Sequence, residues 1–377
     1  MKSKNLEILK SLVAIKSAYP DEAKLSNFLA EYLKNLGFKV DIVMTKSNRP
    51  NIVAKNLASK SYLAFYGHMD TVSADSKYER DPLDIWVEDQ GLARGLGVSD
   101  MKGGIAAILS VAAYAQNNKL PIKIIFCVDE ENISLGAHDL LTSNLLNDID
   151  FLISAESGQV TNEKQPYSVC YGRRGRIALD VVVAGRKVHA AEHSKGVNAI
   201  IDASKFVIAC ADLVFPPDVN FGATALVVHQ ISGMTDSFSV PDSCKLYFSA
   251  LTTPSIRHDD VINELRELAR SIGVEAKVSP QKRTTPYAES YEIDTSNLLL
   301  KKIEQDIFTT DRITPLYTAS VADENIFANK LGIPVISLGP IGGGDHTVNE
   351  WVSIQSIDNV ALVYEKILHL YNSTKHN

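Results

Sequence analysis

The sequence has few cysteines, few tryptophans and no long apolar run. Its 377 residues include 4 cysteines and 2 tryptophans. The cysteines are scattered without Cys-x-x-Cys spacing, which argues against a disulfide framework or a zinc finger and favours reduced thiols. No apolar stretch is long enough to cross a bilayer, and the N-terminus begins an amphipathic helical pattern rather than a signal peptide. We therefore expect a cytoplasmic protein without a membrane partner.

Excess positive charge and several familiar catalytic motifs are also missing. The net charge of −7 gives no support to a nucleic-acid-binding groove. No Gly-x-Ser-x-Gly elbow of a serine hydrolase is evident. The segment Gly95-Leu96-Gly97 begins like a dinucleotide fingerprint, but Asp100 stands where the third glycine belongs and no strand directly precedes it. Nucleic-acid, serine-hydrolase and nucleotide-binding functions are therefore disfavoured.

The length and the element pattern predict two domains, one of them inserted into the other. A chain of this size with 45% hydrophobic and 22% charged residues can bury a large core. Over residues 177–278 the pattern is strand, helix, strand, strand, helix, strand, which resembles a ferredoxin-like unit. A helix at 296–307 and a strand at 333–338 then resume the first domain. We expect a discontinuous catalytic domain of residues 1–173 and 287–377, and an inserted domain of residues 174–286.

Four short apolar runs each lead to a histidine or a carboxylate. Because the carboxyl ends of parallel strands meet at one edge of a sheet, these side chains are expected to gather there. The runs and the residues that follow them are 62–66 with His68 and Asp70, 122–128 with Asp129-Glu130-Glu131, 151–154 with Glu156, and 333–338, which continues through a glycine-rich loop to His346.

Two histidines and several carboxylates suit Zn²⁺, with Co²⁺ or Mn²⁺ as alternatives. Two adjacent glutamates cannot both project in one direction, so one can bind metal while the other faces the substrate as a base. More ligands are present than one tetrahedral ion needs, which favours two ions about 3.5–4 Å apart. Asp70 can accept the second ring N–H of His68 and fix its tautomer. The candidates are His68, Asp100, Glu130, Glu131, Glu156 and His346.

Taken singly, each of these features has a simpler interpretation. Asp129-Glu130-Glu131 alone is typical of a solvated acidic turn. A lone histidine after a strand, such as His68, is commonly structural. Gly342-Gly343-Gly344 could be only a flexible turn. The metal-site prediction therefore depends on the whole set.

The same residues resemble the co-catalytic zinc amidohydrolase and peptidase family. This family includes succinyl-diaminopimelate desuccinylase, acetylornithine deacetylase, aminoacylases and glutamate-releasing carboxypeptidases. The resemblance covers essentially the whole chain. It implies an α/β fold with a mixed-sheet, zinc-peptidase-like catalytic domain, an inserted ferredoxin-like α+β lid and dimerisation domain, and a homodimer. The motifs that carry it are Gly67-His68-Met69-Asp70-Thr71-Val72, Ser99-Asp100-Met101-Lys102-Gly103-Gly104, Asp129-Glu130-Glu131, Ala155-Glu156-Ser157 and His346-Thr347-Val348-Asn349-Glu350.

The resemblance also implies a role for each site residue. One metal would be bound by His68 and Glu156, and the other by Glu131 and His346. Asp100 would bridge the two metals. Asp70 would support His68, and Glu130 would be the general base. His189 would stabilise the oxyanion in the partner subunit's site, and Arg173 would contact a substrate carboxylate.

The substrate-binding positions depart from the family pattern. Relatives usually carry arginine where this chain has Leu251 and asparagine where it has Phe238. Without that guanidinium a bidentate contact is lost, so either Arg173 anchors the substrate alone or the substrate is not a standard N-acyl-α-amino acid. The resemblance implies hydrolysis of the amide of an N-acyl amino acid, with biosynthetic deacylation favoured. The alternatives are a carboxypeptidase or dipeptidase, and a non-catalytic dimeric scaffold, which should have lost a ligand or the base.

Overall fold

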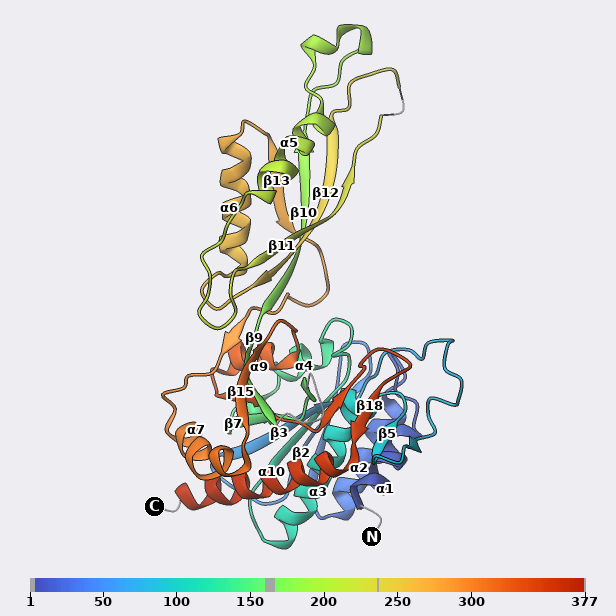
Figure 1. The fold of residues 1–377 in the computed structure, drawn as a ribbon, viewed down its shortest axis with the longest axis vertical. Coiled ribbons are helices and arrows are strands. Elements are labelled where there is room, and N and C mark those ends of the chain that lie inside the picture. The colour runs from blue at the N-terminus through green and yellow to red at the C-terminus, as the bar shows by residue number, and fades with distance from the viewer. Residues whose placement is uncertain (1–3, 160–166, 236, 376–377) are drawn as a thin grey trace. The chain divides into compact units, whose positions relative to one another are not determined.

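The computed structural model describes residues 4–159, 167–235 and 237–375, and the chain forms two compact units (Figure 1). The first unit contains Met1–Gly172, Ile293–Leu316 and Ala322–Asn377. The second contains Arg173–Glu292 and also the short segment Tyr317–Val321. Nothing in the sequence indicated that the chain contributes this later segment to the second unit. The functional roles expected for the two domains stay predictions.

The centre of the first unit is a set of four parallel strands in the order β6-β3-β7-β16. They correspond to the four apolar runs identified in the sequence. Antiparallel β1 and β2 extend the sheet beyond β6, and antiparallel β9, with β15 beside it, extends it beyond β16. The strands are β1 (Lys39–Met44), β2 (Pro50–Lys55), β3 (Tyr62–His68), β6 (Lys123–Cys127), β7 (Ile149–Ser154), β9 (Ser168–Arg173), β15 (Thr314–Thr318) and β16 (Val335–Ser337).

Helices lie on both faces of this mixed sheet, as β3 shows directly. Successive side chains of a strand point to opposite faces. The ring of Phe65 lies 4.8 Å from that of Tyr364 in α10 (Ile354–Thr374), whereas the ring of Tyr66 lies 5.1 Å from that of Phe327 in α9 (Asp323–Leu331). Every residue of β3 is buried, which explains why its sequence is continuously apolar rather than alternating.

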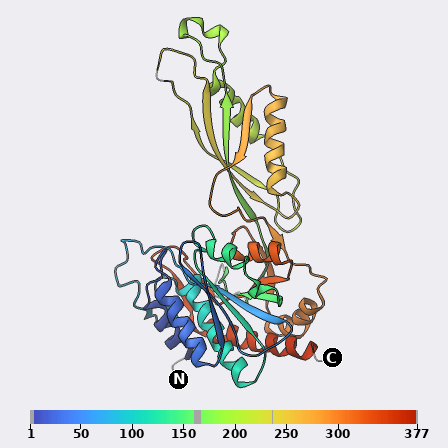
Figure 2. The same ribbon diagram turned by 180° about the vertical axis from the view of Figure 1, so that it is seen from behind.

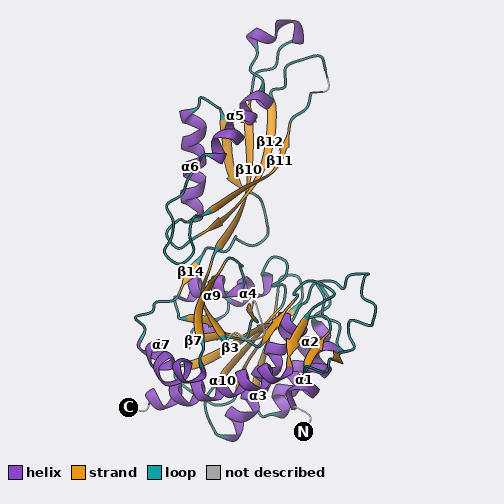
Figure 3. Cartoon of the chain, viewed as in Figure 1, coloured by secondary structure: helices purple, strands orange, loops and turns teal. Residues whose placement is uncertain are grey.

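The other helices of the first unit are shown from two sides in Figures 2 and 3. Among the described residues, no helix has the length and apolar character needed to cross a membrane. The helix expected over 296–307 is α7 followed by a π-helical turn. These elements are α1 (Lys4–Val13), α2 (Ala23–Asn35), η1 (Val98–Lys102), α3 (Gly103–Asn117), α4 (Leu135–Leu140), η2 (Asn144–Leu146), α7 (Leu298–Ile303), η4 (Glu304–Phe308) and α8 (Thr309–Asp311).

A second, smaller sheet in this unit brings in His346. The glycine-rich segment expected to be a loop contains strand β17, so His346 follows β17 and not β16 directly. A Cβ atom at Gly342 would lie 2.3 Å from Ser99 Oγ, so glycine is required here by close packing rather than by turn flexibility. The sheet order is β4-β5-β18-β17-β8, formed by β4 (Trp86–Val87), β5 (Leu92–Arg94), β8 (Gly158–Gln159), β17 (Ile341–Gly343) and β18 (Trp351–Ser353).

The second unit has the ferredoxin-like fold that the sequence predicted. Its four strands pair antiparallel in the order β11-β12-β10-β13. The order along the chain is strand, helix, strand, strand, helix, strand, which confirms the inserted α+β unit. The elements are β10 (Gly175–Ala184), η3 (Ala190–Lys195), α5 (Ala199–Ala211), β11 (Ala225–Ser232), β12 (Ser243–Thr252), α6 (His258–Ser271) and β13 (Ala276–Pro280). The short strand β14 (Tyr291–Glu292) belongs to the nine-stranded main sheet instead.

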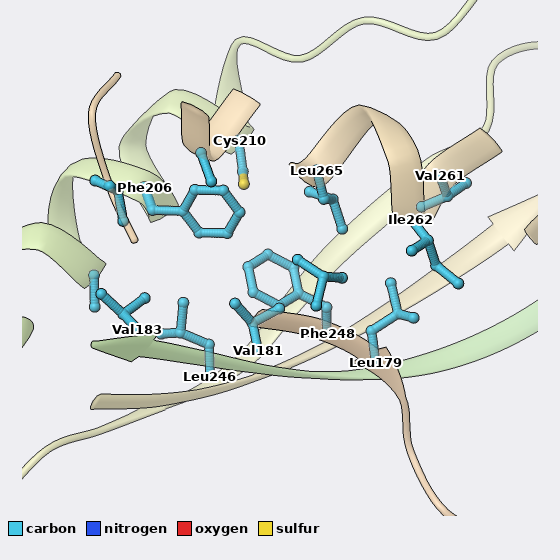
Figure 4. Packing of buried hydrophobic residues seen from close by; sticks show 14 of the residues in the cluster. Leu179, Val181, Val183, Phe206, Cys210, Leu246, Phe248, Val261, Ile262 and Leu265 are labelled. Atoms are coloured by element: carbon cyan, nitrogen blue, oxygen red, sulfur yellow. The ribbon is translucent and has the colours of Figure 1, made fainter. Parts of the chain in front are cut away.

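Helices α5 and α6 cover one face of this sheet and enclose its hydrophobic core (Figure 4). Phe206 of α5 contacts Phe248 of β12 edge to face, with ring centroids 6.1 Å apart. In β10, Leu179 and Val181 are completely buried, whereas the intervening side chains face the opposite side. The core is therefore internal to the second unit.

We expect acid to destabilise the second unit through His258, the first residue of α6. Burial, followed by the charge of Arg257, lowers the pKa of His258 from 6.5 to about 4, and these effects outweigh the carboxylate of Glu289, which lies 3.4 Å from His258 Nδ1. Between these two pH values the unfolded chain binds a proton that the folded unit does not, so the free energy of unfolding falls as the pH falls. The loss approaches about 3 kcal/mol near pH 4 and is absent above pH 7.

The measurement is the urea midpoint of unfolding at pH 7 and pH 4.5, with H258Q as the variant. H258Q should show a smaller loss on acidification than the wild-type protein. The matched control is H193Q, because His193 is exposed in the same unit. Equal losses for wild-type protein and H258Q would contradict the assignment.

Candidate metal centre

His68 ends β3 and meets two carboxylates at one ring nitrogen. Its Nε2 lies 2.9 Å from Asp100 Oδ1 and 3.2 Å from Glu156 Oε1, and the His68 side chain is fully buried. Glu156 follows β7, the neighbour of β3, and Asp100 lies in η1 before α3. A single N–H cannot satisfy two carboxylates at once, whereas a cation placed among the three side chains could.

His346 forms a second group of the same kind with the other oxygen of Asp100. Its Nε2 lies 3.2 Å from Asp100 Oδ2 and 3.0 Å from the carboxylate of Glu131. The side chain of His346 is 53% exposed, so this group is accessible to solvent. Asp100 therefore faces two imidazoles with its two separate oxygens, which is the arrangement of a bridging carboxylate.

The donor set fits divalent cations. Ligand atoms of His68, Asp100 and Glu131 all lie within 4.8 Å of one another. Burial, followed by the charge of Asp100, raises the pKa of Glu156 to about 7. Hydrogen bonds to Asp100 and Glu131 raise the pKa of His346 to about 10. These shifts reflect an accumulation of carboxylates that a cation would offset, and nitrogen with carboxylate oxygen suits Zn²⁺, Co²⁺ or Mn²⁺.

Asp70 holds the glutamate loop rather than the ring of His68 alone. The nearest acceptor for His68 Nδ1 is the backbone carbonyl of Asp70 at 2.9 Å, and the Asp70 carboxylate is 3.7 Å away. That carboxylate accepts the backbone N–H groups of Glu130 at 3.2 Å and Glu131 at 2.9 Å. The Asp70 carboxylate thus holds the glutamate loop and lies beside the His68 ring, and its expected role in fixing the tautomer of His68 stays a prediction.

Glu130 and Glu131 have separate environments. Glu131 pairs with His346, whereas none of the described residues donates a hydrogen bond to the carboxylate of Glu130. Burial raises the pKa of Glu130 well above its usual value, and although His68 opposes the shift, the charges of Asp323 and Glu156 add to it. A partly buried carboxyl with a raised pKa and no hydrogen-bond donor among the described residues has the properties of a proton-transfer group.

A buried ion-pair network supports the same loop and could not be predicted from the sequence. Arg49 donates from Nη1 to Asp129 Oδ1 at 2.6 Å and from Nε to Glu22 Oε2 at 3.0 Å. All three residues are less than 10% exposed. Asp129 also accepts the backbone N–H of Leu135 at 2.9 Å. An isolated arginine before a proline gives no sequence signal for this role.

Arg173 and His189 belong to the second unit and are described within it. Arg173 is 7% exposed and donates from Nη1 to Ser320 Oγ at 2.6 Å. His189 is exposed, and its Nδ1 accepts the backbone N–H of Ala191 at 3.1 Å, which assigns the ring proton to Nε2. The substrate and oxyanion roles expected for these residues stay predictions.

The model of peptidase family M20/M25/M40 matches residues 64–370, a span that includes every residue of both ligand groups. The chain belongs to this family. The resemblance drawn from the motifs is therefore confirmed, and the protein is a metal-dependent hydrolase of the M20/M25/M40 family with a candidate metal site at His68, Asp100 and Glu131.

Relatives of this M20/M25/M40 protein include both deacylases and peptidases. It is 26% identical to a succinyl-diaminopimelate desuccinylase of Sulfurimonas denitrificans, over 99% of this chain and 100% of that protein. It is 27% identical to an acetylornithine deacetylase of Vibrio atlanticus, over 97% and 98% respectively. A tripeptidase structure from Staphylococcus aureus has the same fold, with a TM-score of 0.76, 22% identity and 97% of each chain covered.

Proposed function

We propose that this M20/M25/M40 hydrolase cleaves the amide of an N-acyl amino acid, as a cytoplasmic deacylase of amino-acid biosynthesis. The observation that carries the proposal is Asp100, whose two oxygens face His68 and His346 separately while Glu130 stays unpaired beside them. The relatives named as desuccinylase and deacetylase, similar along almost their whole length, support the substrate class.

The proposed metal ligands are His68 and Glu156 for one cation, Glu131 and His346 for the other, and Asp100 for both. Two divalent ions, for which the donor set favours Zn²⁺ with Co²⁺ or Mn²⁺ as alternatives, would polarise the amide carbonyl and acidify a water molecule. Asp70 would keep Glu130 and Glu131 in place through their backbone N–H groups. The protein contribution to chemistry is thus mainly orientation and proton transfer.

Glu130 is the proposed general base and acid. Its carboxylate takes a proton from the attacking water as the oxygen adds to the carbonyl carbon. It then delivers the proton to the leaving nitrogen, so the carbon–nitrogen bond breaks without releasing an unstable amide anion. A raised pKa suits this double role, because a group that both accepts and returns a proton works best when its pKa lies near the working pH.

The second unit is proposed to serve as lid and dimerisation domain. Exposed apolar side chains on the edge strand β11 and on α5 support pairing with a second copy: Val227 is 47% exposed, Ile231 48%, Ile201 55% and Ile208 69%. In this homodimer His189 would stabilise the oxyanion in the partner subunit's site, and Arg173 would bind a substrate carboxylate. Sedimentation equilibrium tests the dimer, and a monomer at micromolar concentration would contradict it.

A dipeptidase or carboxypeptidase is the second candidate, because the family is one of peptidases and a tripeptidase has the same fold. Leu251 of β12 stands in place of an arginine, and Phe238, which is 86% exposed, stands in place of an asparagine. Both changes remove polar groups that could select the α-carboxylate that deacylase and peptidase substrates share, so they do not distinguish these two classes. A non-catalytic scaffold is disfavoured because each proposed ligand and Glu130 are present.

The test is metal content per chain together with a substrate panel. We expect about two metals per chain and hydrolysis of N-acetylornithine or N-succinyl-diaminopimelate. Turnover of dipeptides alone would replace the deacylase with the peptidase. Absence of metal after incubation with zinc or cobalt salts would contradict the metalloenzyme mechanism.

A further inference from the structure

Glu350 is a buried carboxylate that lies just after the loop of His346 and reaches the loop of Asp100. It is 2% exposed. Its Oε2 accepts the backbone N–H of Gly97 at 2.8 Å, and its Oε1 accepts those of Ser99 at 2.8 Å and Asp100 at 3.1 Å. A single side chain thus satisfies three backbone amides within four residues.

The backbone N–H groups of the Asp100 loop have no regular secondary structure to pair with, so they require an acceptor such as the Glu350 carboxylate. Gly97 has a φ of +73°, and a Cβ there would lie 2.5 Å from Thr71 Cγ2, so the backbone is tightly packed in a left-handed turn. Amides in such a turn cannot join a strand or a regular helix, and leaving them unpaired in a buried position costs about 1–3 kcal/mol each. Burial raises the pKa of Glu350 to about 7 even with the three donors, which shows how far this carboxyl is withdrawn from water.

The backbone of Glu350 is held on the other side by the loop that carries His346. Its N–H donates to the carbonyl of Thr347 at 3.3 Å, and Arg94 donates from Nη1 to the carbonyl of Asn349 at 2.8 Å. Strand β18 begins at the next residue, Trp351, and pairs with β5. The position of Glu350 is therefore fixed by the small sheet, independently of the Asp100 loop.

We propose that Glu350 is a positioning residue for the metal centre, which links the Asp100 loop to the His346 loop and thereby directs the two oxygens of Asp100 to the two ligand groups. This inference rests on the proposed function, because it assumes that Asp100 bridges two metals. Glu350 acts through the backbone and is 2% exposed, so it contacts neither substrate nor metal in this role. The sequence motif contains Glu350 but gave no sign of this role, since the three amides become visible only in the folded loop.

The test is metal affinity of the full-length protein, measured by competition with a chelating dye for Zn²⁺ and by the absorption spectrum of the Co²⁺ form. E350Q keeps the shape of the side chain but replaces one acceptor oxygen with a donor that opposes a backbone N–H. We expect the affinity of at least one metal to fall about 10–100-fold, as for other groups that orient ligands. The Co²⁺ spectrum should change, and kcat should fall more than KM rises.

The matched control is E289Q. Glu289 also accepts a backbone N–H, that of His258, but it lies in the second unit. Its amide variant should bind metal like the wild-type protein even if it melts at a lower temperature. If E350Q does not fold, E350D replaces it, because the shortened carboxylate keeps its charge but cannot reach all three amides and should still weaken metal binding.

The outcomes separate this inference from the proposed function. If wild-type protein binds two metals and the Glu350 variant that folds binds them equally well, the positioning role is overturned and the proposed function stands. If wild-type protein binds no divalent metal, both are overturned. Weakened binding in the Glu350 variant with normal binding in E289Q supports the linkage, because a purely structural role would not change the affinity measured well below the melting temperature.

Discussion

E130Q should lower kcat by at least about 10²–10⁴-fold, the usual contribution of a positioned acid–base group, while both metals remain bound. The amide has the shape of the carboxyl but cannot take a proton from water or deliver one to the leaving nitrogen. None of the described residues donates a hydrogen bond to the Glu130 carboxylate, so the substitution breaks no protein contact there. The measurement is turnover at saturating substrate alongside metal content of the same preparation.

The adjacent glutamate provides the control. Glu131 pairs with His346, so E131Q should weaken binding of one metal, whereas E130Q should not. The two variants are alike in chemistry and in sequence position, which separates proton transfer from metal binding. Near-normal turnover of metal-loaded E130Q would show that another group is the base, and loss of metal from E130Q would make Glu130 a ligand.

The sequence predicted the elements that depend on one strong local pattern. The parallel strands β6, β3, β7 and β16 were identifiable because each is a short apolar run that ends at a polar residue, and strands of that kind are buried on both faces. The ferredoxin-like unit was identifiable from its order of strands and helices, and the observed pairing confirms it.

The parts that the sequence did not predict depend on contacts between distant segments. β17 and β18 have three residues each, too few for periodicity, so the path from β16 to His346 looked like a loop. The roles of Asp70 and Glu350 depend on backbone amides that converge only after folding. A side chain that accepts hydrogen bonds from backbone N–H groups can pair with residues of any type. Such a contact therefore leaves no recognisable motif in the sequence.

Asp100 is expected to be the ligand whose removal has the widest effect. In D100A both ligand groups lose an oxygen, because Oδ1 lies 2.9 Å from His68 and Oδ2 lies 3.2 Å from His346. Groups that only orient ligands typically contribute about 10–100-fold to metal affinity. We expect D100A to lower the affinity for each metal by more than this, and turnover to fall below detection. The measurement is metal stoichiometry after dialysis against a graded chelator series.

Single-group variants distinguish a bridge from an ordinary ligand. E156A should weaken one metal and E131A the other, because the shortest contacts pair Glu156 with His68 at 3.2 Å and Glu131 with His346 at 3.0 Å. The exposed Asp75 offers a control, D75A, that should retain both metals. If D100A loses one metal and keeps the other at wild-type affinity, Asp100 belongs to one ligand group, and the two-metal arrangement would have to be replaced by two independent sites of unequal strength.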